Sequence, residues 1–234
     1  MNIAALRERI DSALQQETEH GSLATLLAGR IDELHRAIRL PGKDAPGALL
    51  RFVRAYIGEV PAQMEAVARV AVEASLDAQI EPALSLAEQF LLPPEQSREG
   101  HDGLETLLAA AYLTHRLVEE INDRYIVHFG QPQTPVDTTV ANLIAHRLLG
   151  ESFANRLDAA VQEIIDTLVD ARIFAGEAAS QFREKLANAP QAATRRHWPC
   201  LAQRLGIELQ SPTRPGHCAD NAAQCPVAEL SPAG

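Results

Sequence analysis

The segment AYLTHRLVEEINDRY, residues 111–125, carries polar side chains whose types and spacing could bind a ligand. Successive residues of an α-helix are about 100° apart, so His115, Glu119 and Asn122 share one flank of this segment. His115 and Glu119 are four residues apart, which lets their side chains meet. An imidazole and a carboxylate on one flank are typical of metal or small-ligand sites inside helical bundles.

A following segment repeats this polar pattern. Asn142 and His146 are four residues apart in TTVANLIAHRLLG and lie away from its main apolar side. The connection from the preceding helix, 130–137, is short, and short connections favour antiparallel neighbours. We therefore expect the two helices to bring Asn142 and His146 near His115 and Glu119.

Two interpretations of this cluster are open. In the functional one, two imidazoles and a carboxylate hold a single divalent metal ion. The predicted ligands are His115, Glu119 and His146, and the predicted surrounding polar network is Asn122, Asn142 and Glu151. In the structural one, the same groups satisfy each other's hydrogen bonds and fix the register of packed helices without any ligand.

Other metal and catalytic patterns are weaker. Di-metal bundles use Glu-x-x-His on two helices, whereas Glu17-x-x-His20 lies at a helix end here. Cys200, Cys218 and Cys225 lack the Cys-x-x-Cys spacing that predicts a zinc site. The sequence contains no Gly-x-Ser-x-Gly elbow and no phosphate-binding loop. A divalent metal is thus the one cofactor considered.

Apolar residues recur at intervals of three and four along most of the chain, which predicts an all-α fold. Aromatic residues make up only 4%, and the Ala- and Leu-rich remainder favours helix-on-helix packing. No segment shows the alternation typical of strands. We predict a multi-helix bundle divided into an N-terminal antiparallel helical hairpin (1–40), a bundle core (41–210) and a disordered tail (211–234).

Capping residues set the predicted helix boundaries. Gly21 suits a left-handed C-terminal cap and Ser22 an N-cap, which divides the hairpin into two helices. The second of these is expected to run to about residue 40. Pro61 and Pro82 suit the first turns of two further helices, because proline has no backbone N–H to lose there.

The charge excludes some classes of partner. The formal net charge of −10 repels phosphate backbones, so nucleic-acid binding is disfavoured. No apolar run reaches the roughly 18 residues of a spanning helix, and the first residues lack the apolar stretch of a secretory signal. We expect a cytoplasmic protein that binds neither nucleic acid nor a membrane.

The hairpin has a narrow apolar seam and charged outer faces, a pattern typical of helices that pair with another helix. An equal alternative is that the seam completes the chain's own core. The leading hypothesis is a non-enzymatic regulator, adaptor or self-associating scaffold that binds a protein partner, or a second copy, through this hairpin. The alternative is a metal- or small-ligand-binding bundle, conceivably an oxidoreductase, that uses the His/Glu cluster.

Overall fold

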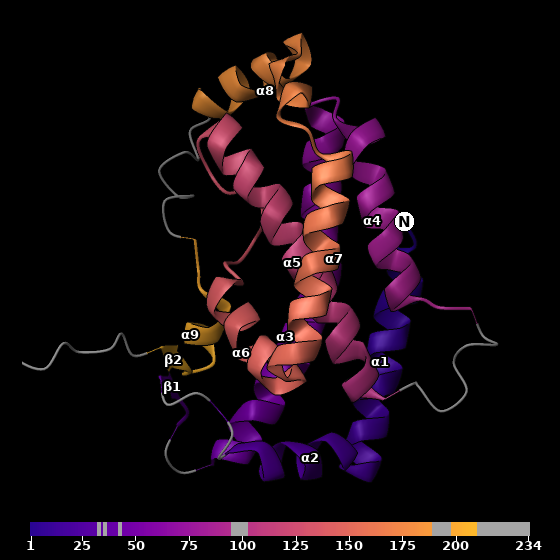
Figure 1. The fold of residues 1–234 in the computed structure, drawn as a ribbon, viewed down its shortest axis with the longest axis vertical. Helices are drawn as coiled ribbons and strands as arrows, with labels where there is room; N and C mark the ends of the chain where they lie inside the picture. The colour runs from indigo at the N-terminus through magenta and orange to yellow at the C-terminus, as the bar shows by residue number, and fades with distance from the viewer. Residues whose placement is uncertain (32–33, 35–36, 42–43, 95–102, 189–197, 210–234) are drawn as a thin grey trace, which may run out of the picture.

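The computed structural model describes residues 1–31, 34, 37–41, 44–94, 103–188 and 198–209, so the predicted tail lies outside the described part. The described chain is a helical bundle, as predicted. Figure 1 shows α2 crossing the bottom of the bundle, α8 crossing its top and α7 in front. The elements are α1 Ile3–His20, α2 Ser22–Arg30, β1 Ile38–Arg39, α3 Ala45–Glu73, α4 Asp77–Leu91, α5 Leu104–Phe129, α6 Thr139–Leu149, α7 Glu151–Leu168, η3 Ala171–Ala175, α8 Glu177–Ala187, α9 Leu201–Arg204 and β2 Glu208–Leu209.

Helix α5 is the centre of the bundle. It packs against α1, α3, α4, α6, α7 and α8. Its predicted apolar stripe is buried, including Leu107, Leu117, Ile121 and Tyr125. Burying a large apolar side chain contributes about 1.5–3 kcal/mol relative to leaving it exposed. This packing fixes the rotation of α5, and with it the positions of His115 and Glu119.

The two predicted proline boundaries are wrong. Pro61 lies inside the continuous helix α3, and Pro82 lies in the sixth position of α4 rather than in its first turn. An internal proline costs a helix roughly 3 kcal/mol because it removes one hydrogen bond and crowds the preceding turn. In α3, Val60 before Pro61 and Met64 after it are fully buried. Their burial outweighs the cost of the proline.

The described residues also contain a short strand pair that the sequence pattern did not predict. β1 and β2 are antiparallel, with Ile38 opposite Leu209 and Arg39 opposite Glu208. The second hairpin helix therefore ends at Arg30 and does not continue to about residue 40. Two-residue strands are too short to produce a visible alternation of apolar and polar residues.

The N-terminal hairpin packs on the chain's own core. Leu6, Ile10, Leu23 and Leu27 are buried in the same hydrophobic cluster as the bundle. α1 contacts α3 and α5, and α2 contacts α3. The apolar seam is thus occupied within the chain, so binding of a partner through this hairpin, which stays a prediction, would have to use its outer charged faces.

The N-terminus of α2 is capped by a side chain of α1, six and seven residues earlier in the sequence. Gly21 adopts the predicted left-handed conformation, with φ of 63°. It is also the N-cap of α2, so the expected side-chain cap from Ser22 is absent. The first N–H groups of α2, which have no partner within the helix, donate instead to Glu17, whose carboxylate oxygens accept from Leu23 N and Ala24 N, both at 2.9 Å.

We expect Glu17→Ala to lower the free energy of unfolding by about 1 kcal/mol, because loss of a helix N-cap costs roughly that much. The measurement is urea unfolding followed by circular dichroism. Glu19→Ala, an exposed position on the same helix, is the matched control and should change stability by less than about 0.5 kcal/mol. Equal effects of the two substitutions would contradict a capping role.

Among the described helices, none combines the length and apolar character needed to cross a membrane.

Candidate functional site

His115 is completely buried where α5 meets α3. Its Nε2 lies 2.7 Å from the backbone oxygen of Tyr56. A carbonyl oxygen can only accept a hydrogen bond, so Nε2 carries the proton and donates. Nδ1 is buried and has no hydrogen-bond partner among the described residues. Burial lowers the pKa of His115 to about 4, so the side chain is a neutral imidazole packed against the Tyr56 ring at 4.3 Å.

A chain of buried hydrogen bonds connects α3, α6 and α5 beside this histidine. The Tyr56 hydroxyl donates to Asn142 Oδ1 at 2.6 Å. The Asn142 amide nitrogen in turn donates to Glu119 Oε2 at 2.7 Å. Burial raises the pKa of Tyr56 well above its usual value, so the hydroxyl remains a donor. Asn142 therefore links α6 to both neighbouring helices.

Arg116 joins this chain to a second one. Its guanidinium donates to Glu119 from Nη1, to Glu120 from Nη2 at 3.2 Å and to Asp158 of α7 from Nε at 3.1 Å. Burial opposes the charge of Arg116, but Glu119 and Asp158 raise its pKa above the ordinary arginine value. One cation thus holds three carboxylates from α5 and α7 together.

Asp158 is the meeting point on α7. The Tyr112 hydroxyl donates to both of its oxygens, at 2.8 and 3.0 Å. Burial, and then the hydrogen bond to Asp158, raise the pKa of Tyr112. We refer to the connected side chains of Tyr56, Asn142, Glu119, Arg116, Asp158 and Tyr112 as the polar network.

The polar network forms one wall of a pocket of about 520 Å³ between α5, α6 and α7. Its charged and polar lining includes Arg116, Glu119, Asn142, His146 and Asp158. Ile38 of β1 and Leu143 of α6, which is 53% exposed, provide apolar surface beside these groups. The site therefore combines apolar walls with a few fixed polar groups, the usual character of small-molecule sites.

No family model, curated protein or solved structure matches this chain. The geometry of the pocket and of the polar network is therefore the basis for any functional conclusion.

The structure does not assemble His115, Glu119 and His146 as metal ligands. His115 faces the Tyr56 carbonyl in the core and is not part of the pocket lining. His146 lies at the pocket, with Nε2 at 3.0 Å from Asn155 Oδ1 and 3.8 Å from Asp158 Oδ2. Within the described residues, no group of three His, Cys, Asp or Glu side chains could hold a metal ion.

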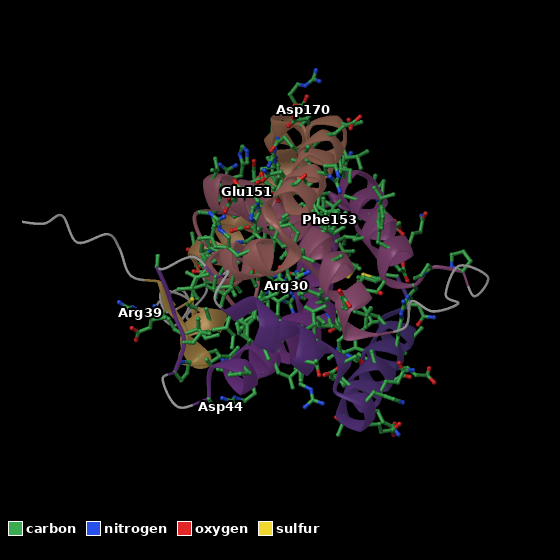
Figure 2. The ribbon with its side chains drawn as sticks, turned by 60° about the horizontal axis from the view of Figure 1, so that its bottom comes forward. Arg30, Arg39, Asp44, Glu151, Phe153 and Asp170 are labelled. Atoms are coloured by element: carbon green, nitrogen blue, oxygen red, sulfur yellow. The ribbon has the colours of Figure 1, made fainter. Side chains whose placement is uncertain are left out.

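The three residues expected around the ligands have different roles. Asn142 belongs to the polar network, whereas Asn122 is buried elsewhere and accepts a hydrogen bond from Gln133 N at 2.8 Å. Asn122 thereby braces the loop after α5. Glu151 is exposed and pairs with Arg147 at 3.3 Å. Figure 2 shows Glu151 near the start of α7, with Arg30 of α2 below it in that view.

Cys200 is the one cysteine in the described residues. It is half-buried before α9, where the adjacent backbone pairs with Asp137 through Asp137 N to Pro199 O and Leu201 N to Asp137 O, both at 2.9 Å. This pairing attaches the segment to the start of α6. Cys218 and Cys225 lie outside the described residues.

Sequence reasoning missed four members of the polar network: Tyr56, Tyr112, Arg116 and Asp158. Arg116 lies outside the predicted cluster, and its side chain is only 24% exposed. A signal was available for Arg116, because Glu119 and Glu120 follow it at the spacings that permit ion pairs along a helix. Tyr56 and Asp158 reach the network only through helix packing, which no local pattern records.

Proposed function

We propose that this chain is a small-molecule-binding helical bundle whose site is the pocket between α5, α6 and α7. The observation that carries the proposal is a pocket of about 520 Å³ lined by two carboxylates, two guanidinium groups, an imidazole and an amide. Sites for small organic ligands commonly measure about 300–1,000 Å³. The volume and the lining both fall within this class.

The polar network supports a binding role because it holds the pocket wall in place before any ligand arrives. Glu119 is bound by Asn142 and Arg116, and Asp158 by Tyr112 and Arg116. Groups fixed in this way lose little freedom when a ligand binds, which favours affinity.

The competing proposal, contact with a partner through the N-terminal hairpin, has less support. Its motivation was an apolar seam available to another helix. That seam contains Leu6, Ile10, Leu23 and Leu27, all buried against the rest of the chain. The pocket is therefore the better basis for a function.

Filling the pocket should abolish ligand binding. We expect a panel of small organic amines, alcohols and carboxylates to include members that give ligand-observed NMR signals with the full-length protein. Leu143→Trp places a large side chain at the pocket and should remove those signals. Val127→Trp, at an α5 position that is 77% exposed and not among the pocket-lining residues, is the control and should retain them.

The proposal fails if no panel member binds the wild-type protein, or if binding survives in Leu143→Trp. Circular dichroism of both tryptophan variants would establish that they fold like the wild type. Because both substitutions enlarge exposed apolar residues, general stickiness of a new surface tryptophan would affect the two variants alike.

A further inference from the structure

In the ion-pair network centred on Arg116 and Arg124, the carboxylates outnumber the guanidinium groups. Arg116 is shared by Glu119, Glu120 and Asp158. Arg124 pairs with Glu120 at 3.4 Å. Arg124 also pairs with Asp166 at 4.0 Å, so four carboxylates share two guanidinium groups, which leaves an excess of two negative charges.

The excess charge acts on a neighbouring side chain. Asp123 follows this group on α5, and its pKa is raised first by burial and then by the negative charges of Glu119 and Glu120. Arg147 also lines the pocket, but it pairs with Glu151 at 3.3 Å and so adds no net charge. The ion-pair network behind Glu119 therefore carries an excess of negative charge.

One carboxylate oxygen at the pocket is left without a bond. Both hydrogen bonds that Glu119 makes within the described residues end on Oε2, which accepts from Arg116 and from Asn142. Oε1 accepts none there, although the Glu119 side chain is only 12% exposed. Oε1 is also not among the polar atoms sealed away from solvent without a partner. Glu119 lines the pocket, so we infer that this oxygen is the acceptor offered to a ligand there.

The lining favours an organic cation over a metal ion. A metal ion needs several anionic or imidazole ligands directed at one point, and no such group exists in the described chain. Ile38 and Leu143 instead offer apolar surface for a hydrocarbon chain.

We propose that the pocket binds a primary amine in its ammonium form, with the ammonium at Glu119 Oε1 and the apolar part along Leu143 and Ile38. This inference rests on the proposed function and adds the chemical class of the ligand. An ammonium group brings a positive charge and three donors. An anionic ligand would meet an excess of negative charge and an arginine already occupied by three carboxylates.

The test compares three probes of equal chain length, hexylammonium, hexan-1-ol and hexanoate, by NMR titration of the full-length protein at about pH 8, where histidine side chains are as a rule neutral. Hexylammonium should bind about tenfold more tightly than hexan-1-ol, because both can donate a hydrogen bond to Glu119 but only the ammonium adds the attraction between opposite charges. Hexanoate should bind most weakly of the three.

A matched pair of variants locates the ammonium. Glu119→Gln should remove most of the roughly tenfold preference for hexylammonium over hexan-1-ol, because the variant keeps a hydrogen-bond acceptor but loses the charge. Glu120→Gln removes the other carboxylate that α5 directs at Arg116, but Glu120 does not line the pocket, so this control should change affinity by less than about threefold. The comparison of probes on the wild-type protein holds even if Glu119→Gln folds poorly.

The outcomes separate this inference from the proposed function. If hexan-1-ol or hexanoate binds as tightly as hexylammonium or more tightly, and Leu143→Trp abolishes that binding, the ammonium assignment is overturned and a small-molecule site remains. The same conclusion holds if other panel members bind and hexylammonium does not. Absence of binding by every probe and panel member overturns both proposals.

Discussion

Lowering the pH from about 7 to about 4 should reduce the free energy of unfolding by up to about 3 kcal/mol through His115 alone. Burial lowers the pKa of this histidine to about 4 in the folded chain, from an ordinary value of 6.5. Above pH 6.5 the imidazole is neutral in both states and has no effect. Between 6.5 and 4 the unfolded chain binds a proton that the folded chain excludes, so stability falls as the pH falls.

The measurement is urea unfolding of the wild type and of His115→Gln across this pH range. Glutamine can still donate to the Tyr56 carbonyl but does not titrate, so the stability of the wild type relative to the variant should decline with decreasing pH. Titrations shared by the two proteins cancel in this difference. His20→Gln, at an exposed position of α1, is the control and should show a much weaker decline. A difference between wild type and His115→Gln that stays constant from pH 7 to 4 would refute the buried neutral imidazole.

His115 also shows how far local sequence patterns can be followed. The spacing of apolar residues placed it on the edge of the α5 core face, next to covered neighbours, and it is indeed buried. Whether it could meet His146 depended on the rotation of α6 relative to α5, which the packing of α3, α5 and α6 decides. The pattern along one helix contains no information about that rotation.

The fold itself was largely predictable because helices are local. The 3-4 periodicity and the short connection at 130–137 correctly predicted α5 and α6, and Gly21 correctly ended α1. The errors arose where tertiary packing overrides a local rule. α3 continues through Pro61 because both sides of it are buried, and β1 exists because β2, far along the chain, pairs with it.

The candidate site was predicted only in part for the same reason. Glu119, Asn142 and His146 were identified, and all three line the pocket. Two of the missed members come from other helices. Tyr56 of α3 bonds Asn142, which is 86 residues away in the sequence, and Asp158 of α7 bonds Arg116, which is 42 residues away. A contact across such distances follows from the three-dimensional packing and not from a motif.

Removing the cation at the centre of the polar network should be strongly destabilising. We expect Arg116→Met to lower the free energy of unfolding by about 2–3 kcal/mol, because it leaves Glu119, Glu120 and Asp158 facing each other without a counter-charge. Loss of one partner from a fully buried ion pair costs about 3–5 kcal/mol. The smaller value expected here reflects the remaining solvent exposure of these side chains, which is 12% for Glu119, 21% for Glu120 and 31% for Asp158.

The matched control is Arg147→Met, which breaks an ion pair between side chains that are 40% and 68% exposed. Such surface pairs contribute roughly 0–1 kcal/mol, so its effect should be small. Arg116→Lys should recover only part of the loss, because one ammonium cannot reproduce a guanidinium that donates from three nitrogens to three carboxylates. Urea unfolding at neutral pH measures all three variants. If Arg116→Met and Arg147→Met cost the same, the network is a set of independent surface pairs, and the fixed pocket wall on which ligand binding depends does not exist.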